Sequence, residues 1–385
     1  MTRLALAEAL IVDVPTIRPH VLAMATMQSQ AMVILRLVDS DGIEGFGEGT
    51  TIGGLSYVEE SPESIKSAID TYIVPVLQQL DISSVGAAMM AVGKAVRGNH
   101  FAKCAVETAL LDLAGKRLGV PAAQLIGAGP VRTSLPVAWT LASGETERDI
   151  AEAQEMLERR RHRIFKLKIG KRDVPDDVAH VAAICAALGP DASVRVDVNQ
   201  NWSEVEALRG MAMLRDIGCD LVEQPVAGDD LGAMARLTLQ GSVPLMADEA
   251  LRGPRVAMRA AAANAAHVFA IKIAQSGGLH AAYDVASIAH AAGIGIYGGT
   301  MLEGGIGTAA SAQAFASLPA LEWGTELFGP LIQRDDILTE PLHYADFALA
   351  IPTLPGIGVT PDPDKLQFYR RDRSRSSHPV SQTGA

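Results

Sequence analysis

Charged residues recur at the ends of successive apolar runs in the second half of the chain. Lys166 and Lys168 flank Leu167 in the run Phe-Lys-Leu-Lys-Ile, and single charged residues end four later runs: Asp197, Glu223, Asp248 and Lys272. Residues i and i+2 of a strand point to the same side, so the two ammonium groups of the first run can enter one cavity together. A charge at the end of a buried strand is costly unless it is paired, which favours a shared site.

The spacing of these residues matches a repeating structural unit. From Lys168 onward the intervals are 29, 26, 25 and 24 residues, each the length of one strand and one helix. Consecutive parallel strands would therefore deliver Lys, Asp, Glu, Asp and Lys to one rim, where barrel folds place their active sites. A surface charge or a salt bridge would explain any one of these residues alone, but not five in phase with the fold.

Three carboxylates that converge on one rim would repel one another without a cation. Hard oxygen ligands in this number suit Mg²⁺ or Mn²⁺, and no Cys or His stands among them to suggest zinc. A divalent ion can act as a Lewis acid toward a substrate carboxylate while a lysine moves a proton at the adjacent carbon. The pattern predicts an enzyme that stabilises an enolate, with Lys168 as the base and Lys166 beside it.

Eight short apolar runs alternate with Ala-rich stretches of helical character, and these elements must position the charged residues. The expected strands are residues 135–140, 164–169, 193–198, 221–223, 245–247, 268–273, 293–297 and 321–325. Repeated strand–helix units predict a parallel sheet, and eight of them predict closure into a barrel. We therefore expect an α/β fold, a modified (β/α) barrel of seven or eight units.

The first third of the chain has a pattern typical of a smaller α+β domain. Asp41-Gly42 lies between two β-rich runs, which is a strong signal for a hairpin. Ser61-Pro62 is a typical helix start, and residues 101–118 have apolar side chains at helical spacing within a helical region over 61–119. Strands are expected at 4–14, 31–38 and 43–48, and loops at 16–27 and 49–57.

These patterns divide the chain into four parts. We expect an α+β capping domain at 1–130, a catalytic barrel at 131–340, a C-terminal segment at 341–367 and a disordered polar tail at 368–385. The C-terminal segment contains a strand-like run at 344–351, which we expect to return to the capping domain.

Composition limits the classes of function. The chain has 385 residues, 48% of them hydrophobic and 20% charged, which is typical of a globular enzyme. A net charge of -11 argues against nucleic acid or an anionic membrane as a partner, and favours a small molecule. Three separated cysteines and the lack of a signal-like or membrane-spanning run indicate a cytoplasmic protein without a disulfide framework. The cysteines are expected to be buried apolar residues.

The chain resembles the enolase superfamily, and within it the muconate-lactonising (muconate cycloisomerase) subgroup. The Lys-x-Lys, Asp-x-Asn, Glu-Gln-Pro, Asp-Glu and Ile-Lys blocks match the superfamily in order and spacing. Flanking blocks resemble the subgroup and extend the likeness over nearly the whole chain: Asp-x-Pro-Thr-Ile-Arg-Pro-His, Gly-Glu-Gly-Thr-Thr-Ile-Gly-Gly, residues 138–144, 297–303 and 323–330. The resemblance implies reversible lactonisation of cis,cis-muconate to muconolactone in the degradation of catechol and other aromatic compounds.

The resemblance also implies a role for each charged residue. Asp197, Glu223 and Asp248 would bind one Mn²⁺ or Mg²⁺ per subunit, with Asn199 and Glu249 behind them. Lys168 would be the acid–base group at the α-carbon, and Lys166 would orient the substrate. Lys272 would face the opposite side of the substrate, and Glu326 matches a proton-donor position, although a carboxylate that pairs with Lys272 is an equally good interpretation.

Substrate contacts are expected from the capping loops and from the last barrel strands. The candidates are Ile52, Gly53, Tyr57, Thr300, Met301 and Phe328. For Tyr57, plain packing explains the sequence as well. Related chloromuconate enzymes tend to carry Val and Ile where this chain has Ile52 and Phe328, which favours the unchlorinated substrate. His20 is the one histidine near a predicted loop. It is a candidate for a substrate contact, but a lone loop histidine is more often at the surface.

Other functions remain open at this point. A chloromuconate cycloisomerase, a dipeptide or N-acylamino-acid epimerase, or an o-succinylbenzoate synthase would use the same scaffold. In an epimerase, Lys168 and Lys272 would act as bases on opposite faces of the substrate. A Schiff-base aldolase would need one buried lysine and no metal, which the three carboxylates argue against. A non-catalytic scaffold is disfavoured because no ligand or lysine is lost. The resemblance implies a homo-oligomer, such as an octamer.

Overall fold

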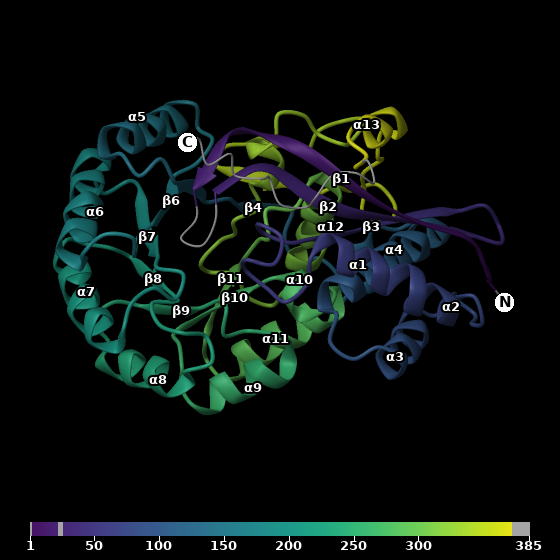
Figure 1. Cartoon of the computed structure of the whole chain (residues 1–385), viewed down its shortest axis with the longest axis horizontal. Coiled ribbons are helices and arrows are strands. Elements are labelled where there is room, and N and C mark those ends of the chain that lie inside the picture. Colours follow the sequence, from purple (N-terminus) through teal and green to yellow (C-terminus); the bar gives the residue numbers. More distant parts are fainter. Residues whose placement is uncertain (1, 22–25, 372–385) are drawn as a thin grey trace, which may run out of the picture.

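A curved parallel sheet of seven strands, surrounded by helices, forms the second half of the chain in the computed structural model, which describes residues 2–21 and 26–371 (Figure 1). The strands follow the order of the sequence across the sheet. They are β5 (Trp139–Leu141), β6 (Ile164–Lys168), β7 (Ser193–Asp197), β8 (Leu221–Glu223), β9 (Leu245–Ala247), β10 (Val268–Ile271) and β11 (Gly295–Gly298). This is the parallel barrel architecture that the strand–helix repeat predicts.

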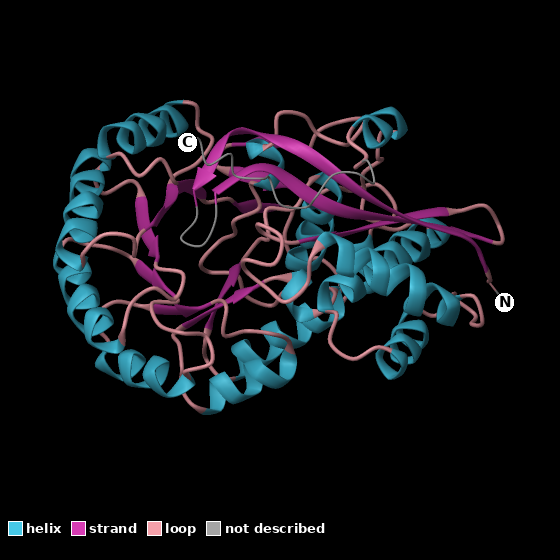
Figure 2. Cartoon of the chain, viewed as in Figure 1, coloured by secondary structure: helices cyan, strands magenta, loops and turns pink. Residues whose placement is uncertain are grey.

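Helices cover the outside of this sheet (Figure 2). They are α5 (Thr146–Glu158), α6 (Val174–Leu188), α7 (Glu204–Asp216), α8 (Leu231–Gln240), α9 (Pro254–Ala262), α10 (Ile273–Ser276), α11 (Leu279–Ala291) and α12 (Gly305–Ala316). Several of these helices begin at a side chain that caps the first turn. In α7, for example, Ser203 and Glu206 form a reciprocal capping box. A single long helix connects each strand to the next (α5 to α9, and then α11), so the chain returns each time to the same end of the sheet and the strands all point one way.

The eighth expected strand does not form. Of residues 321–325, only Thr325 pairs, through parallel bridges to Val137 and Gly298 at the two ends of the sheet. Gly324 has a φ of 73°, which is incompatible with an extended strand, and this explains why the run stops there. The ring is therefore closed by single bridges instead of by a full strand.

The first expected barrel strand is split in two. β5 joins the barrel, whereas β4 (Ser134–Pro136) pairs with β13 (Ala348–Ala350), next to β12 (Tyr344–Ala345), in a separate three-stranded sheet. Pro136 pairs with Ala348, and the Val137 N–H still donates to the Phe347 carbonyl at 3.1 Å before the chain enters β5. The run 344–351 thus pairs with β4 and does not join the capping sheet as expected.

The capping domain is a three-stranded antiparallel sheet with helices packed on one face. Its strands are β1 (Leu4–Val21), β2 (Thr26–Asp39) and β3 (Glu44–Thr50). Its helical segments are α1 (Pro62–Ala68), a π-helical turn (Ile69–Ile73), α2 (Val74–Leu77), α3 (Val85–Ala95), α4 (His100–Leu118) and a 3₁₀ turn (Ala122–Leu125). The expected helix at 101–118 and the start at Ser61-Pro62 are confirmed.

Glycines in β3 allow α4 to lie directly on the sheet. A Cβ on Gly47 would stand 1.9 Å from the carbonyl oxygen of Ala105, and one on Gly45 would stand 2.2 Å from that of Ala109. The expected loop at 16–27 is wrong for most of its length, because β1 continues to Val21. The register shifts between Pro15 and His20, which absorbs the irregularity that Pro15 and Pro19 introduce.

The end of the described chain packs on the capping domain. After a 3₁₀ turn (Gly329–Ile332) and α13 (Pro363–Phe368), the Asp13 N–H donates to the Tyr369 carbonyl and the Arg371 N–H donates to the Ile11 carbonyl. Arg371 also pairs with Asp13 and Glu63. Residues 368–371 of the expected tail are therefore bound to β1, and the rest of it, 372–385, lies outside the described residues.

Two further findings concern the whole described chain. None of its helices is long and apolar enough to cross a membrane. All three cysteines are free thiols, with Cys104 and Cys219 buried and Cys185 partly buried, as expected.

Candidate active site

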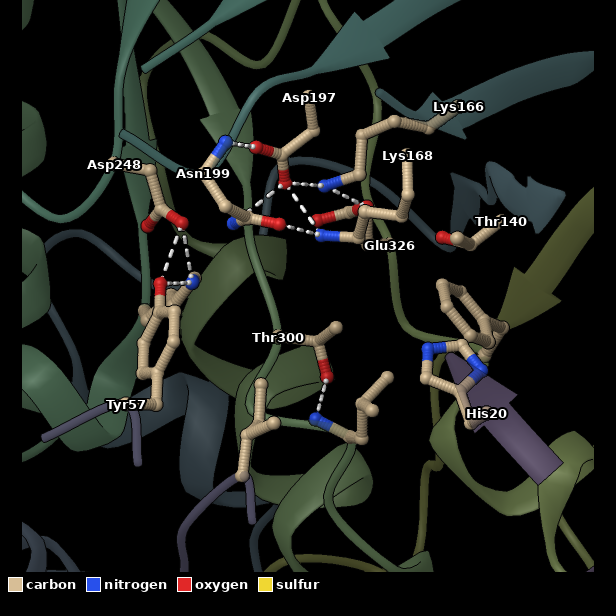
Figure 3. Close-up of a pocket in the computed structure, with 14 residues that line it drawn as sticks. His20, Tyr57, Thr140, Lys166, Lys168, Asp197, Asn199, Asp248, Thr300 and Glu326 are labelled. Atoms are coloured by element: carbon tan, nitrogen blue, oxygen red, sulfur yellow. Dashed lines mark hydrogen bonds and ion pairs between the residues drawn. The ribbon is translucent and has the colours of Figure 1, made fainter. Parts of the chain in front are cut away.

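The carboxyl ends of neighbouring strands bring the predicted charged residues to one rim, and Figure 3 shows Lys166, Lys168, Asp197 and Asp248 gathered there. The strand register pairs Lys168 of β6 with Asp197 of β7, and Asp197 with Glu223 of β8. Asp248 directly follows β9, and Lys272 directly follows β10. Because these parallel strands end side by side, the structure brings together all the charged residues that the spacing singled out.

Lys166 joins three carboxylates. Its Nζ lies 2.8 Å from Oε2 of Glu223 and 3.5 Å from Oδ2 of Asp197, and it also pairs with Glu326. Burial alone would lower the pKa of Lys166, but Glu223, Glu326 and Asp197 raise it well above its ordinary value. The interpretation that Glu326 pairs with Lys272 is wrong, because Glu326 forms its ion pair with Lys166.

Lys168 enters the pocket from the same side of β6. Its Nζ donates to Oδ2 of Asp197 at 2.6 Å and to Oδ1 of Asn199 at 3.1 Å. Burial alone would raise the pKa of Asp197, but Lys168 and Lys166 lower it to about 2. The side chain of Lys168 is 15% exposed and that of Lys166 only 4%, so Lys168 is the more accessible of the two.

Lys272 and Asp248 form a second group, with Tyr57 from the capping domain. Nζ of Lys272 lies 2.7 Å from Oδ2 of Asp248, and the Tyr57 hydroxyl donates to the same oxygen at 2.8 Å. Lys272 also donates to the Tyr57 hydroxyl at 2.9 Å and stands 5.0 Å from the centre of its ring. Tyr57 therefore contacts the charged residues directly, which plain packing does not explain.

The carboxylates are close enough to influence one another. The pKa of Glu223 is raised well above its ordinary value, first by burial and then by the negative charge of Asp197, with Lys166 opposing both. The pKa of Glu249 is raised to about 8 by burial and by Asp248. Asn199 donates to Asp197 at 3.2 Å and to Glu249 at 3.1 Å, so its amide links two of the acids.

The donor set fits a hard divalent cation, although ammonium groups lie between the carboxylates here. Within residues 2–21 and 26–371, no three His, Cys, Asp or Glu side chains are placed so as to hold a metal ion. The lysines instead satisfy Asp197, Asp248 and one oxygen of Glu223, while Oε1 of Glu223 is buried without a hydrogen-bond partner. A cation would satisfy such an orphaned oxygen, so ligation by these acids stays a prediction.

The pocket beside these groups is lined by residues from both domains. Four of the six expected substrate contacts line it: Ile52, Tyr57, Thr300 and Phe328. Gly53 and Met301 are not among the lining residues. Met301 is fully buried, and its carbonyl accepts a hydrogen bond from the amide of Gln30 at 3.2 Å. Gly53 lies in the turn that follows β3, with a φ of 62°.

Three further residues line the pocket: His20, which the sequence offers as a candidate contact but favours as a surface residue, and Thr140 and Leu302, which were not among the expected contacts. His20 is 2% exposed and belongs to β1, so the expectation of a surface loop histidine is wrong. Burial and the charge of Lys168 lower the pKa of His20 to about 3, which leaves the ring neutral near pH 7. Figure 3 shows His20 across the pocket from Tyr57 and Asp248. The strand repeat points to Thr140, but no sequence signal singles out Leu302.

Two family models match the chain and together cover most of it. Residues 6–127 match the mandelate racemase/muconate lactonizing enzyme N-terminal domain, and residues 148–365 match the enolase C-terminal domain-like family. The chain belongs to the enolase superfamily. The resemblance that the strand-end motifs carry is thereby confirmed, as is the combination of a parallel barrel with an antiparallel capping sheet.

Individual members of the superfamily match over nearly the full length. Muconate cycloisomerase 1-2 of Acinetobacter lwoffii is 55% identical over 370 residues, 96% of each chain. A crystal structure of muconate lactonizing enzyme from Pseudomonas fluorescens, complexed with muconolactone, superposes with a TM-score of 0.95 at 55% identity, covering 96% of this chain and 100% of that one. A chloromuconate cycloisomerase of Cupriavidus pinatubonensis is 44% identical, over 94% of this chain and 98% of its own.

Proposed function

We propose that the chain is a muconate cycloisomerase, which interconverts cis,cis-muconate and muconolactone. The observation that carries the proposal is the meeting of three lysines and three strand-end carboxylates beside a pocket that the capping domain closes. The muconate cycloisomerase relatives match more closely than the chloromuconate enzyme, at 55% against 44% identity.

The charges of the site suit a dianion. Lys166, Lys168 and Lys272 each pair with a carboxylate, and a divalent ion held by Asp197, Glu223 and Asp248 would leave these ammonium groups in excess. An acidic protein would then carry a cationic pocket, which attracts a dicarboxylate. We infer one Mn²⁺ or Mg²⁺ per subunit. When bound, this ion supplies Lewis acidity that favours the enolate form of a substrate carboxylate.

The chain's own residues then bind the diacid and move one proton. One carboxylate of muconate forms a C–O bond to the conjugated double bond, and the α-carbon at the other end gains a proton from Nζ of Lys168. The dianion becomes a monoanionic lactone, and the reverse reaction returns the proton to Lys168. The accessibility of Lys168 supports this assignment, since a general acid must reach its target carbon.

The remaining charged residues orient the substrate in this proposal. Lys166 is fixed by Glu223 and Glu326 and would hold a carboxylate in place, without giving up its proton. Lys272, held by Asp248 and Tyr57, would face the opposite side of the bound diacid. Asn199 and Glu249 would keep Asp197 in position.

The capping domain would close the pocket during the reaction. Ile52, Tyr57 and His20 reach the pocket from residues 1–130, while Thr140, Thr300 and Phe328 reach it from 131–340. A pocket built from two domains can exclude water and select the substrate by shape. We infer that the first part acts as a cap and the second as the catalytic barrel, within a cytoplasmic homo-oligomer.

A side-by-side absorbance assay tests the proposal. The purified protein, supplied with Mn²⁺, is offered cis,cis-muconate, its chlorinated analogues and an Ala–Glu dipeptide. We expect the highest kcat/KM with cis,cis-muconate. Preference for a chlorinated analogue would indicate a chloromuconate cycloisomerase, whose relative also matches the chain, and epimerisation of the dipeptide alone would overturn the proposal.

A further inference from the structure

A buried glutamate of the capping sheet holds the start of a barrel helix. Glu48 of β3 is 2% exposed, and its carboxylate accepts the backbone N–H groups of Gly304 and Gly307, each at 2.7 Å. The Thr50 hydroxyl donates to it at 2.6 Å. Since Gly304 and Gly307 lie at the N-terminus of α12, the carboxylate takes up backbone donors that the helix itself leaves free.

A second buried glutamate shapes the segment just before α12. Glu303, also 2% exposed, accepts the N–H of Met301 at 2.8 Å and pairs with the hydroxyl of Thr300. The Leu302 N–H donates to the Thr300 oxygen at 2.9 Å, and Leu302 has a φ of 59°, a conformation that branched residues rarely adopt. Thr300 and Leu302 both line the pocket, so these bonds define one of its walls.

Gln30 connects this wall to the capping loop. Its amide group donates to the carbonyl of Met301 at 3.2 Å and to that of Thr51 at 3.3 Å, and the residue is fully buried. Thr51 directly precedes Ile52, which lines the pocket from the capping side. One side chain of β2 therefore fixes the distance between the two walls.

We infer that Glu48 and Gln30 are positioning residues that set the width of the substrate pocket between Ile52 and the segment 300–302, and thereby its selectivity between cis,cis-muconate and bulkier diacids. Neither residue lines the pocket. They act through backbone atoms of the residues that do. The inference on selectivity rests on the proposed function, while the inference on wall position does not.

The carboxylate of Glu48 cannot be replaced by an amide without loss. In its ionised form it accepts three hydrogen bonds and donates none. In glutamine, the amide NH₂ is a donor and would face a backbone N–H, which is also a donor. A buried donor without an acceptor is unfavourable, so Glu48→Gln should release the start of α12. Gln30→Leu removes the link between the walls in an independent way.

Asp112 offers a matched control. It is also a fully buried carboxylate that accepts two backbone N–H groups, from Phe46 and Ile357, each at 2.9 Å. Unlike Glu48, it also forms an ion pair with Lys116 at 2.7 Å. It lies in α4, and it does not line the pocket or bond to a residue that does. Asp112→Asn should lower stability in the same way without moving the pocket walls.

The experiment combines hydrogen exchange with kinetics on the metal-loaded enzyme at a pH above 7, where the Glu48 carboxyl is ionised. In Glu48→Gln and Gln30→Leu, amides of residues 300–307 should exchange faster than in the wild type, and those in Asp112→Asn should not. The ratio of kcat/KM for cis,cis-muconate to that for a chlorinated muconate should fall about five-fold, the effect of one lost hydrogen bond. This ratio does not depend on the fraction of folded enzyme, so lower stability alone would not change it.

The outcomes separate the two proposals. Unchanged exchange at 300–307 in both variants overturns the inference, whether or not the protein turns over muconate. Faster exchange with an unchanged ratio overturns the role in selectivity. A wild-type protein that turns over neither muconate overturns the proposed function, while the exchange data still decide the wall position.

Discussion

Two buried acids in this molecule, Asp197 and Glu48, are stabilised in opposite ways. At the strand ends, Asp197 is buried beside two ammonium groups, which lower its pKa to about 2. At the domain seam, Glu48 has only hydrogen-bond donors and the acid Glu303 around it, and burial raises its pKa to about 7. We call the strand-end acids Asp197, Glu223 and Asp248, together with Lys166, Lys168 and Lys272, the lysine cluster. We call Glu48 and Glu303 the seam pair.

The difference follows from what neutralises each acid. Ammonium groups on long side chains can be displaced, so the lysine cluster can exchange a partner for a metal ion or a substrate carboxylate. Backbone N–H groups at the start of α12 are fixed in space and cannot be exchanged for a ligand. The seam pair can therefore only keep the backbone around α12 in position. The lysine cluster is therefore suited to chemistry and the seam pair to positioning.

Removal of the metal should have the largest effect on the lysine cluster. Chelator-treated protein should lose its turnover of cis,cis-muconate, because three carboxylates and the substrate dianion would then face only the lysines. Added Mn²⁺ or Mg²⁺ should restore the rate, as measured by absorbance. Full turnover after exhaustive chelation, with metal content checked by elemental analysis, would show that the acids do not serve as ligands.

Loss of the acid–base lysine should be nearly as severe. Lys168→Ala should lower kcat by roughly three orders of magnitude, because no other accessible group can move the proton. Metal binding should persist, since Lys168 is not among the proposed ligands Asp197, Glu223 and Asp248, which all remain. The exposed Lys171, three residues further on, provides a control whose replacement by Ala should leave the rate unchanged. A near-normal rate in Lys168→Ala would remove the residue from the mechanism.

Much of the lysine cluster could be predicted from the sequence because its members occupy equivalent positions in a local repeat. Each strand end presents its charge at an interval of one strand and one helix, and parallel pairing then aligns the ends. The partner of Glu326 could not be predicted in this way, because it depends on the directions of side chains from different strands. Lys166 and Lys272 both stand near the end of a strand, so the sequence does not show which of the two Glu326 contacts.

The seam pair and the burial of His20 had no comparable signal. Both depend on how the capping sheet lies against the barrel, and Glu48 and Glu303 are 255 residues apart in the chain. The missing eighth strand has a local cause, the left-handed Gly324, but a glycine within an apolar run does not reveal its φ in advance. Local periodicity thus predicted the barrel, while contacts between the domains required the structure.

The seam pair should make stability depend on pH in a direction opposite to that of salt-bridged acids. Burial raises the pKa of Glu48 from 4.5 to about 7, with Glu303 and the thiol of Cys104 as the titratable groups that face it. Below pH 4.5 the folded and unfolded states both bind the proton. Between pH 4.5 and 7 the unfolded state loses this proton while the folded state retains it. Each rise in pH in this range therefore favours the unfolded state, and the free energy of unfolding should fall by about 3 kcal/mol in total.

Urea unfolding at a series of pH values measures this effect. The fall in stability between pH 4.5 and 7 should be smaller in Glu48→Gln than in the wild type, since glutamine does not titrate. Each variant serves as its own reference at low pH, so a general loss of stability cancels. Parallel curves for the two proteins would show that Glu48 ionises normally in the folded state.

Changes in the pocket wall should have the smallest effect and should act on selectivity alone. Phe328 lines the pocket and packs against Trp139 at a ring-centroid distance of 5.3 Å, and Ile52 faces the pocket from the capping domain. Phe328→Ile or Ile52→Val would open space for a chlorine atom, and should shift the kcat/KM ratio toward chlorinated muconates by about tenfold.

Phe165 is equally buried in β6 but does not line the pocket, so Phe165→Ile should lower stability without moving the ratio. Because both wall side chains are apolar and move no proton, kcat for cis,cis-muconate should stay within a few-fold of the wild type. An unchanged ratio would mean that the lysine cluster sets the selectivity. The pocket walls, and the seam pair that positions one of them, would then have no role in it.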